Sequence, residues 1–237
     1  SLKSKKRKSF IDQSLEHNIT SDEKFVYFPL GVDEERNQLI STPLYTNQIE
    51  LIRTISKSLP IDHKLYVKET PDQSIRYWRP INEYKEILSI PNVRLFHPHS
   101  PAEQFLKNCN LVISVGGSSG LEATFFAKPS IVFANLGYSI LPSVSRLNKL
   151  EELPQLIKKS LETPVKAIDL DRYLVFLENN TIDSDPFEVV KRYQQLFYFG
   201  GNLVDVNIES NKMKKFLEDN SPLFESLINE FIKKINE

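Results

Sequence analysis

Short apolar runs alternate with stretches of helical periodicity through the first two thirds of the chain. Each apolar run is rich in β-branched, aromatic and aliphatic residues and stops near proline, glycine or a polar cluster, as buried strands do. The runs predict five strands, at residues 25–28, 64–68, 93–96, 111–115 and 130–134.

Between these strands, apolar residues recur at the spacing of a helix that buries one face. The clearest case is residues 44–59, with Ile49, Ile52 and Ile55 on one side. Ser100, followed by Pro101, predicts a capped start for another helix. The helices expected between strands cover residues 44–59, 84–88, 101–108 and 121–127.

Alternation of strand and helix predicts the α/β class, with a Rossmann-like parallel sheet flanked by helices. Ligands of such sheets bind beyond the carboxyl ends of the strands. After residue 147 the pattern becomes helical, with helices expected at residues 150–161, 187–197 and 223–235 and a stop for the second at Gly200 and Gly201. We therefore predict a polar, basic lead-in with one short helix (1–23), a Rossmann-like lobe (24–147) and a C-terminal helical extension packed on that lobe (148–237).

The most informative segment is a strand, a small flexible turn, a helix and another strand within residues 111–134. Such a turn points backbone N–H groups at one spot near the positive end of a helix, which suits a phosphate. Glu122, in the first helical turn, is placed to accept hydrogen bonds from a ribose. The candidate cradle consists of Gly116, Gly117, Ser118, Ser119 and Gly120.

A structural interpretation of this turn remains open, because every parallel α/β domain needs tight connections between strand and helix. The segment also matches neither the G-x-G-x-x-G fingerprint nor a P-loop.

Composition excludes several classes of function. With 237 residues and a formal net charge of −1, the chain has no global field that would attract nucleic acid. The lone Cys109 excludes an intramolecular disulfide and fits a reducing compartment, where it is expected as a buried thiol. No apolar run reaches the roughly 18 residues of a transmembrane helix, and no signal peptide is evident, so we expect a cytoplasmic protein.

The start of the chain is strongly basic, with Lys3, Lys5, Lys6, Arg7 and Lys8 close together. Two interpretations stay open: a solvated linker, or a peripheral contact with acidic lipid at the inner face of the membrane. Because the chain starts with serine, we expect it to be a piece of a longer protein.

Several segments, in this order, resemble the capsule polysaccharide biosynthesis family, which includes Kdo transferases. Residues 28–34 read FPLGVDE, 45–52 read YTNQIELI and 65–71 read LYVKETP; 77–80 read YWRP and 90–95 read IPNVRL. Gly116 with the run 118–123 (SSGLEA) and Lys128-Pro129 completes the series. The resemblance spans about residues 25 to 140.

This resemblance implies one lobe of a GT-B fold, the C-terminal lobe that binds the nucleotide-sugar donor of a glycosyltransferase. The donor would be CMP- or UDP-linked, with no separate cofactor and no metal. The partner would be an N-terminal acceptor lobe of the full-length protein, which usually supplies the general base. The catalytic residues of this chain are therefore unknown from its sequence, and the chain is an enzyme only as part of a glycosyltransferase.

One departure from the family pattern concerns the second strand end, where relatives have histidine after Lys-Glu and this chain has Thr70. A threonine carries no charge, which puts CMP-sugar use, or catalysis itself, in question. Lys68 would supply a point charge for the phosphate instead, and Glu69 completes this candidate group. His97 and His99 are other candidate donors; they lack the further ligands of a metal site.

Two other functions remain open. A sugar-nucleotide 2-epimerase-like protein would share the fold and the Gly-rich turn and would prefer UDP. A non-catalytic binding or scaffold domain would use the helical extension as a docking surface. Weaker candidates for an acidic site and for a sugar pocket are Asp33, Glu34, Glu35, Tyr77 and Trp78.

Overall fold

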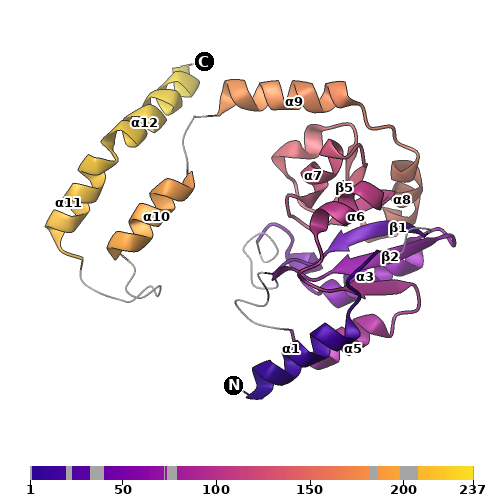
Figure 1. Ribbon diagram of the computed structural model, residues 1–237. Coiled ribbons are helices and arrows are strands. Elements are labelled where there is room, and N and C mark those ends of the chain that lie inside the picture. Colours follow the sequence, from indigo (N-terminus) through magenta and orange to yellow (C-terminus); the bar gives the residue numbers. More distant parts are fainter. Residues whose placement is uncertain are drawn as a thin grey trace. The chain divides into compact units, whose positions relative to one another are not determined.

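The computed structural model describes residues 2–19, 23–32, 40–71, 73, 79–181, 186–197 and 208–236 (Figure 1). Contacts divide the chain into two compact units, Ser1–Leu174 and Val175–Glu237. Several sequence predictions lie outside the described residues: Asp33, Glu34, Glu35, Tyr77, Trp78, Gly200 and Gly201.

The first unit is built on a sheet of six parallel strands in the order β3-β2-β1-β4-β5-β6. The predicted α/β fold with a parallel sheet is confirmed, as are all five predicted strands. The sixth, β6, is three residues long and has only one buried apolar side chain, Val144, which is too weak a pattern to predict. The strands are β1 Lys24–Pro29, β2 His63–Lys68, β3 Val93–Phe96, β4 Leu111–Ser114, β5 Ser130–Val132 and β6 Val144–Arg146.

Side-chain alternation along the strands divides the core into two layers. Val26 and Phe28 of β1 face a cluster built with α3, α5 and α8, whereas Phe25 and Tyr27 face a cluster built with α6 and α7. Apolar residues on both faces of the central strands explain why these strands read as continuous apolar runs. The helices concerned are α3 Gln48–Ser58, α5 Ile81–Leu88, α6 Ala102–Asn108, α7 Ser119–Phe125 and α8 Leu153–Leu161, joined by 3-10 turns η1 Pro43–Tyr45, η2 Gly137–Ile140 and η3 Leu150–Glu152.

Residues 1–23 were predicted as a polar lead-in with one short helix. They contain helix α1, Leu2–Ser14, and Ile11 and Leu15 are buried in the core. Glu16 then extends the edge of β3: its N–H donates to the Leu95 carbonyl at 3.0 Å, and its carbonyl accepts from the N–H of His97 at 2.8 Å. Ile11 and Leu15, with the partly buried Phe10, therefore pack this basic segment against the core.

Two local predictions are corrected. Ser100 does not cap helix α6, because its hydroxyl donates to the carbonyl of His17 at 3.0 Å and the helix begins at Ala102. The helix expected from residue 44 begins at Gln48, where Asn47 accepts the N–H of Glu50 at 3.2 Å as an N-cap. Helix α8, beyond the predicted lobe boundary at residue 147, also packs within the first unit, on α3, β4 and β5.

The C-terminal part is helical, as predicted, with α9 Ala167–Asn180, α10 Pro186–Phe197, α11 Ser210–Asp219 and α12 Ser221–Asn236. Helices α10 and α12 match the predicted ones, whereas α9 and α11 were not predicted. Within the second unit, the buried Phe216 packs edge-on against Tyr193, Phe197 and Phe224. No helix in the described part of the chain is long and apolar enough to cross a membrane. Packing of this extension on the sheet domain stays a prediction.

Gly120 offers a test of the packing between α7 and the sheet. A Cβ atom there would lie 2.9 Å from both the Tyr138 hydroxyl and Cγ1 of Val132, closer than real contacts allow. We expect Gly120→Ala to lower the free energy of unfolding by at least about 1 kcal/mol, as overpacking does. Urea unfolding followed by the fluorescence of the single tryptophan measures this.

Gly117→Ala is the matched control, because its Cβ would meet only Oγ of Ser114, at an ordinary 3.5 Å. It should change the free energy of unfolding by less than about 0.5 kcal/mol. Equal losses for the two variants would contradict the packing role of Gly120.

Candidate functional site

All six strands are parallel, so their carboxyl ends share one edge of the sheet. From β1 the chain crosses to β2 on one side, and later enters β4 on the other side of β1. The boundary between β1 and β4 is therefore the topological switch point, the place where open α/β sheets bind ligands. Gly31 follows β1 at this boundary, and the Gly-rich turn follows β4.

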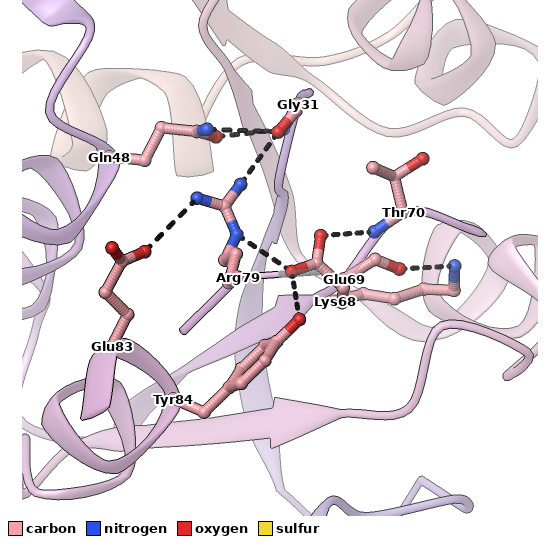
Figure 2. Close-up of polar contacts among 8 residues, drawn as sticks. All are labelled: Gly31, Gln48, Lys68, Glu69, Thr70, Arg79, Glu83 and Tyr84. Carbon is pink, nitrogen blue, oxygen red and sulfur yellow. Dashed lines mark hydrogen bonds and ion pairs between the residues drawn. The ribbon is translucent and has the colours of Figure 1, made fainter. Parts of the chain in front are cut away.

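A buried ion pair lies at the end of β2 (Figure 2). Glu69 is fully buried, and its Oε2 accepts from Nε of Arg79 at 2.8 Å and from the Tyr84 hydroxyl at 3.0 Å. Its Oε1 accepts the backbone N–H of Thr70 at 2.8 Å. Three donors thus satisfy one carboxylate, which is the condition for keeping a charge out of water.

The same arginine reaches from this carboxylate to the exit of β1. Nη2 of Arg79 donates to the Gly31 carbonyl at 2.9 Å, and Nε2 of Gln48 donates to the same oxygen at 3.0 Å. The Gly31 N–H donates in turn to Oε1 of Gln48 at 2.9 Å. Arg79 and Gln48 therefore fix the backbone where β1 ends, beside the switch point.

Burial and charge act in opposite directions on the pKa of the Glu69 carboxyl and together on that of the Tyr84 hydroxyl. Burial raises the pKa of the Glu69 carboxyl, and the charge of Arg79 opposes that effect. Burial, together with the neighbouring Glu69, raises the pKa of the Tyr84 hydroxyl well above its usual range. Tyr84 is consequently a permanent donor to the carboxylate.

Lys68, predicted as a phosphate contact, is buried at the end of β2. Its Nζ donates to the carbonyl of Glu69 at 3.2 Å and to that of Pro98 at 3.0 Å. Burial lowers the pKa of this ammonium group, and Glu69 opposes the shift. Thr70, next along the chain, is partly exposed.

Side chains of β4, β5 and η2 hold the backbone of the Gly-rich turn by hydrogen bonds. The Tyr138 hydroxyl donates to the Gly117 carbonyl, the Gly117 N–H donates to Oγ of Ser114 at 3.3 Å, and the Ser130 hydroxyl donates to the Gly120 carbonyl at 2.9 Å. Gly120 is buried, so its lack of a side chain serves packing. Gly116 is half-buried, and Gly117 is exposed.

The turn also carries polar groups, at Ser118 and Glu122, that form no hydrogen bond with the described strands. Ser118 is exposed and donates through its hydroxyl to Oε1 of Glu122, four residues on. Within the described part of the chain, the N–H groups of Ser118, Ser119 and Gly120 have no hydrogen-bond acceptor. These are the orphan donors expected at the start of a helix.

The predicted site residues therefore form two groups on one edge of the sheet. No hydrogen bond or ion pair between described residues joins the turn to Lys68, Glu69 or Thr70. Sequence reasoning missed the roles of Arg79, Tyr84 and Tyr138. A usable signal existed for Arg79, because a glutamate that ends a buried strand needs a cation nearby.

His97 and His99 lie at the end of β3. Nε2 of His97 is 3.1 Å from Oδ1 of Asp12. The backbone N–H of His99 donates to Nδ1 of His97 at 3.2 Å. Burial lowers the pKa of His97. Among the residues with described positions, no three His, Cys, Asp or Glu side chains are arranged to hold a metal ion.

Comparison with known proteins adds to this geometry. A family model described as capsule polysaccharide biosynthesis protein matches residues 2–159, more than half of the chain. The chain belongs to the capsule polysaccharide biosynthesis family. The resemblance drawn from the short sequence segments is thereby confirmed, and the family match extends over α1 and most of α8 as well. No curated protein sequence matches the chain.

Solved structures similar to this family member include two transferases and an epimerase. A Thermosulfurimonas dismutans beta Kdo 2,7 transferase, KpsC, is 15% identical over 68% of this chain and 53% of its own, with a TM-score of 0.44. The UDP-GlcNAc 2-epimerase of Methanocaldococcus jannaschii is 15% identical over 74% and 50%, with a TM-score of 0.46. The spinosyn rhamnosyltransferase SpnG with thymidine diphosphate is 18% identical over 65% and 40%, with a TM-score of 0.41. The chain thus spans about half the length of the first structures that it matches.

The buried ion pair gives a stability prediction. Arg79→Met leaves the buried Glu69 carboxyl without its cation, which should cost about 3–5 kcal/mol of unfolding free energy. The double variant Glu69→Leu with Arg79→Met removes both charges and should recover most of that loss. Urea unfolding of the single and double variants measures the coupling.

Lys107→Met is the control, because it breaks an ion pair with Glu103 that is more than half exposed on both sides. Its cost should stay below about 1 kcal/mol. A double variant no more stable than Arg79→Met would contradict the coupling between the two charges.

Proposed function

We propose that the first unit is the donor-binding lobe of a glycosyltransferase that builds capsular or another surface polysaccharide. The observation that carries this proposal is the position of the Gly-rich turn. It lies at the switch point of a parallel sheet, in a chain of the capsule polysaccharide biosynthesis family, and three of its N–H groups have no acceptor among the described residues. The proposed ligand is a nucleotide-sugar whose nucleotide is CMP or UDP.

In this proposal the turn holds the donor phosphate. Ser118, Ser119 and Gly120 contribute N–H groups, and Ser119 adds a hydroxyl. Glu122 binds the ribose through Oε2, because Oε1 already accepts the Ser118 hydroxyl. Gly116 and Gly117 leave the approach to the turn clear of side chains.

Lys68, Glu69 and Thr70, at the end of β2, contribute to the proposed site less directly. Lys68 adds a positive charge to the edge from a buried position and does not bond the phosphate directly, because carbonyls hold its ammonium. Thr70 offers its hydroxyl, which has no partner in the described part of the chain. Glu69 fixes the backbone of Thr70 through its N–H.

The proposed reaction is direct displacement of the nucleotide at the anomeric carbon of the donor sugar. Negative charge develops on the leaving phosphate, and N–H groups aimed at it from a fixed turn stabilise that charge without reorganising. The acceptor and its general base would come from another lobe, so the lobe described here should bind nucleotide weakly and transfer no sugar by itself.

We also propose that the protein works in the cytoplasm, at the inner face of the membrane. Lys5, Lys6 and Lys8 are exposed on α1, while Ile11 and Leu15 anchor the helix in the core. An anchored helix with an exposed basic side suits a peripheral contact with anionic lipid.

A titration with CMP, UDP, GDP and ADP tests the nucleotide site. NMR chemical shifts should reveal saturable binding of one pyrimidine nucleotide, with the largest changes at residues 116–122. Ser119→Ala and Glu122→Ala each remove one hydrogen-bonding group and should weaken binding about fivefold or more.

Glu103→Ala is the matched control, because Glu103 is likewise the first-turn glutamate of its helix, α6. It should leave the affinity unchanged. Preference for UDP over CMP would favour an epimerase-like function over CMP-sugar transfer. Absence of binding by all four nucleotides would contradict the donor-lobe proposal and favour a non-catalytic scaffold.

A further inference from the structure

Three of the four histidines of the chain lie together where α1 meets the edge of β3. The ring of His97, just after β3, stacks on the ring of His17 with the centroids 4.5 Å apart. The ring of His99 lies 5.2 Å from that of His97, again between centroids. These three residues form the histidine cluster. Imidazoles change their charge between about pH 5 and pH 8, so contacts made through the cluster can depend on pH.

The contacts of His97 fit its neutral form. Nε2 is 3.1 Å from a carboxylate oxygen of Asp12, which can only accept, and Nδ1 accepts the backbone N–H of His99 at 3.2 Å. These partners assign the single proton of the neutral ring to Nε2. A second proton would have to sit on Nδ1, where it would face the N–H of His99 and deprive it of its acceptor.

The residues of the cluster also hold the N-terminal segment on the sheet. The N–H of His97 donates to the Glu16 carbonyl at 2.8 Å, and the N–H of Glu16 donates to the Leu95 carbonyl at 3.0 Å. The hydroxyl of Ser100 donates to the carbonyl of His17 at 3.0 Å. Charge that builds up on the cluster therefore acts on the same backbone that docks α1 against β3.

The charges around the cluster do not balance three imidazolium groups. Asp12 of α1 is the carboxylate that faces His97, and its side chain is 48% exposed, so water screens its attraction. The other charged groups nearby are paired or cationic: Glu16 and Glu23 with Arg94 of β3, Glu103 with Lys107 of α6, and Lys68 of β2 on the Pro98 carbonyl. Protonation of the cluster would therefore place like charges in contact.

The direction of the pKa shift agrees with this geometry. Burial lowers the pKa of the His97 imidazole, the hydrogen bond to Asp12 opposes this effect, and the charges of His17 and His99 add to it. A solvated histidine has a pKa of about 6.5. Because docked His97 binds its proton more weakly than that, its contribution to docking is complete above about pH 6.5 and is lost as the pH falls below this value.

From the geometry of the cluster we infer that it is a pH-sensitive switch, which holds α1 on the edge of β3 at neutral pH and releases it in acid. The neutral ring of His97 satisfies both of its neighbours, whereas the protonated ring satisfies only Asp12. The inference requires no nucleotide and is independent of the proposed function.

Amide hydrogen exchange of the whole chain, read by NMR at about pH 7.5 and about pH 5.0, tests the inference. Protection factors are compared, because they correct for the intrinsic effect of pH on exchange. Those of Glu16 and His97, whose N–H groups close the docking contact, should fall at least about tenfold in acid, the effect of one pKa unit. Those of β1 should fall by less than about twofold. Equal protection at the two pH values, or an equal fall in β1, would overturn the inference.

Two histidine variants identify the titrating group. His97→Asn retains an amide oxygen that can accept the N–H of His99 but cannot be protonated, so the fall should shrink to less than about twofold. His63→Asn is the matched control, because His63 is also buried and lies 2.8 Å from an aspartate, Asp62, at the amino end of β2. It should keep the tenfold fall. A fall that survives in His97→Asn, or that disappears in His63→Asn, would overturn the inference.

His17→Gln provides a second test if His97→Asn does not fold, because His17 is exposed. This variant removes one of the charges stacked on His97 and should reduce the fall to about threefold or less. A fall as large as that of the unchanged chain would contradict the role of the cluster.

Discussion

The ion pair between Glu69 and Arg79 is the interaction on which the carboxyl edge of the sheet depends. Both side chains are almost completely buried, so each charge is tolerable only in the presence of the other. Through this pair, the end of β2, the start of α5 and the exit of β1 are held together, because Arg79 also bonds the Gly31 carbonyl. Arg79 of this pair thus also fixes the Gly31 backbone, which borders the switch point.

This arrangement separates support from recognition. The groups that hold the edge are buried and fully engaged, as Lys68 and Glu69 are. The N–H groups of Ser118, Ser119 and Gly120, in contrast, have no acceptor within the described residues and remain available to a ligand. Packing also contributes, since Gly120 lets α7 approach Tyr138 and Val132, and the Tyr138 hydroxyl in turn holds the Gly117 carbonyl.

The sequence was sufficient to predict the sheet, because strands buried on both faces leave unbroken apolar runs such as residues 111–115. It was insufficient for β6, where Val144 alone is buried, and for the burial of Ile11 and Leu15, because basic residues dominate the start of the chain. Of the site, the position of the turn and of Lys68 and Glu69 at strand ends followed from parallel topology. The direction of the Lys68 side chain did not, because it depends on the Pro98 carbonyl, thirty positions further on. The contact of Glu69 with Arg79 likewise joins residues separated by a loop, which no periodicity reports.

A nucleotide held by the proposed donor lobe would lie across the boundary between β1 and β4. Intermolecular NOEs between the ribose protons of bound UDP and backbone amides test it most directly. We expect NOEs from the ribose to the backbone amides of Ser119 and Glu122 on the β4 side and of Gly31 on the β1 side. NOEs confined to the amino ends of the strands, or to helices of the second unit, would contradict it.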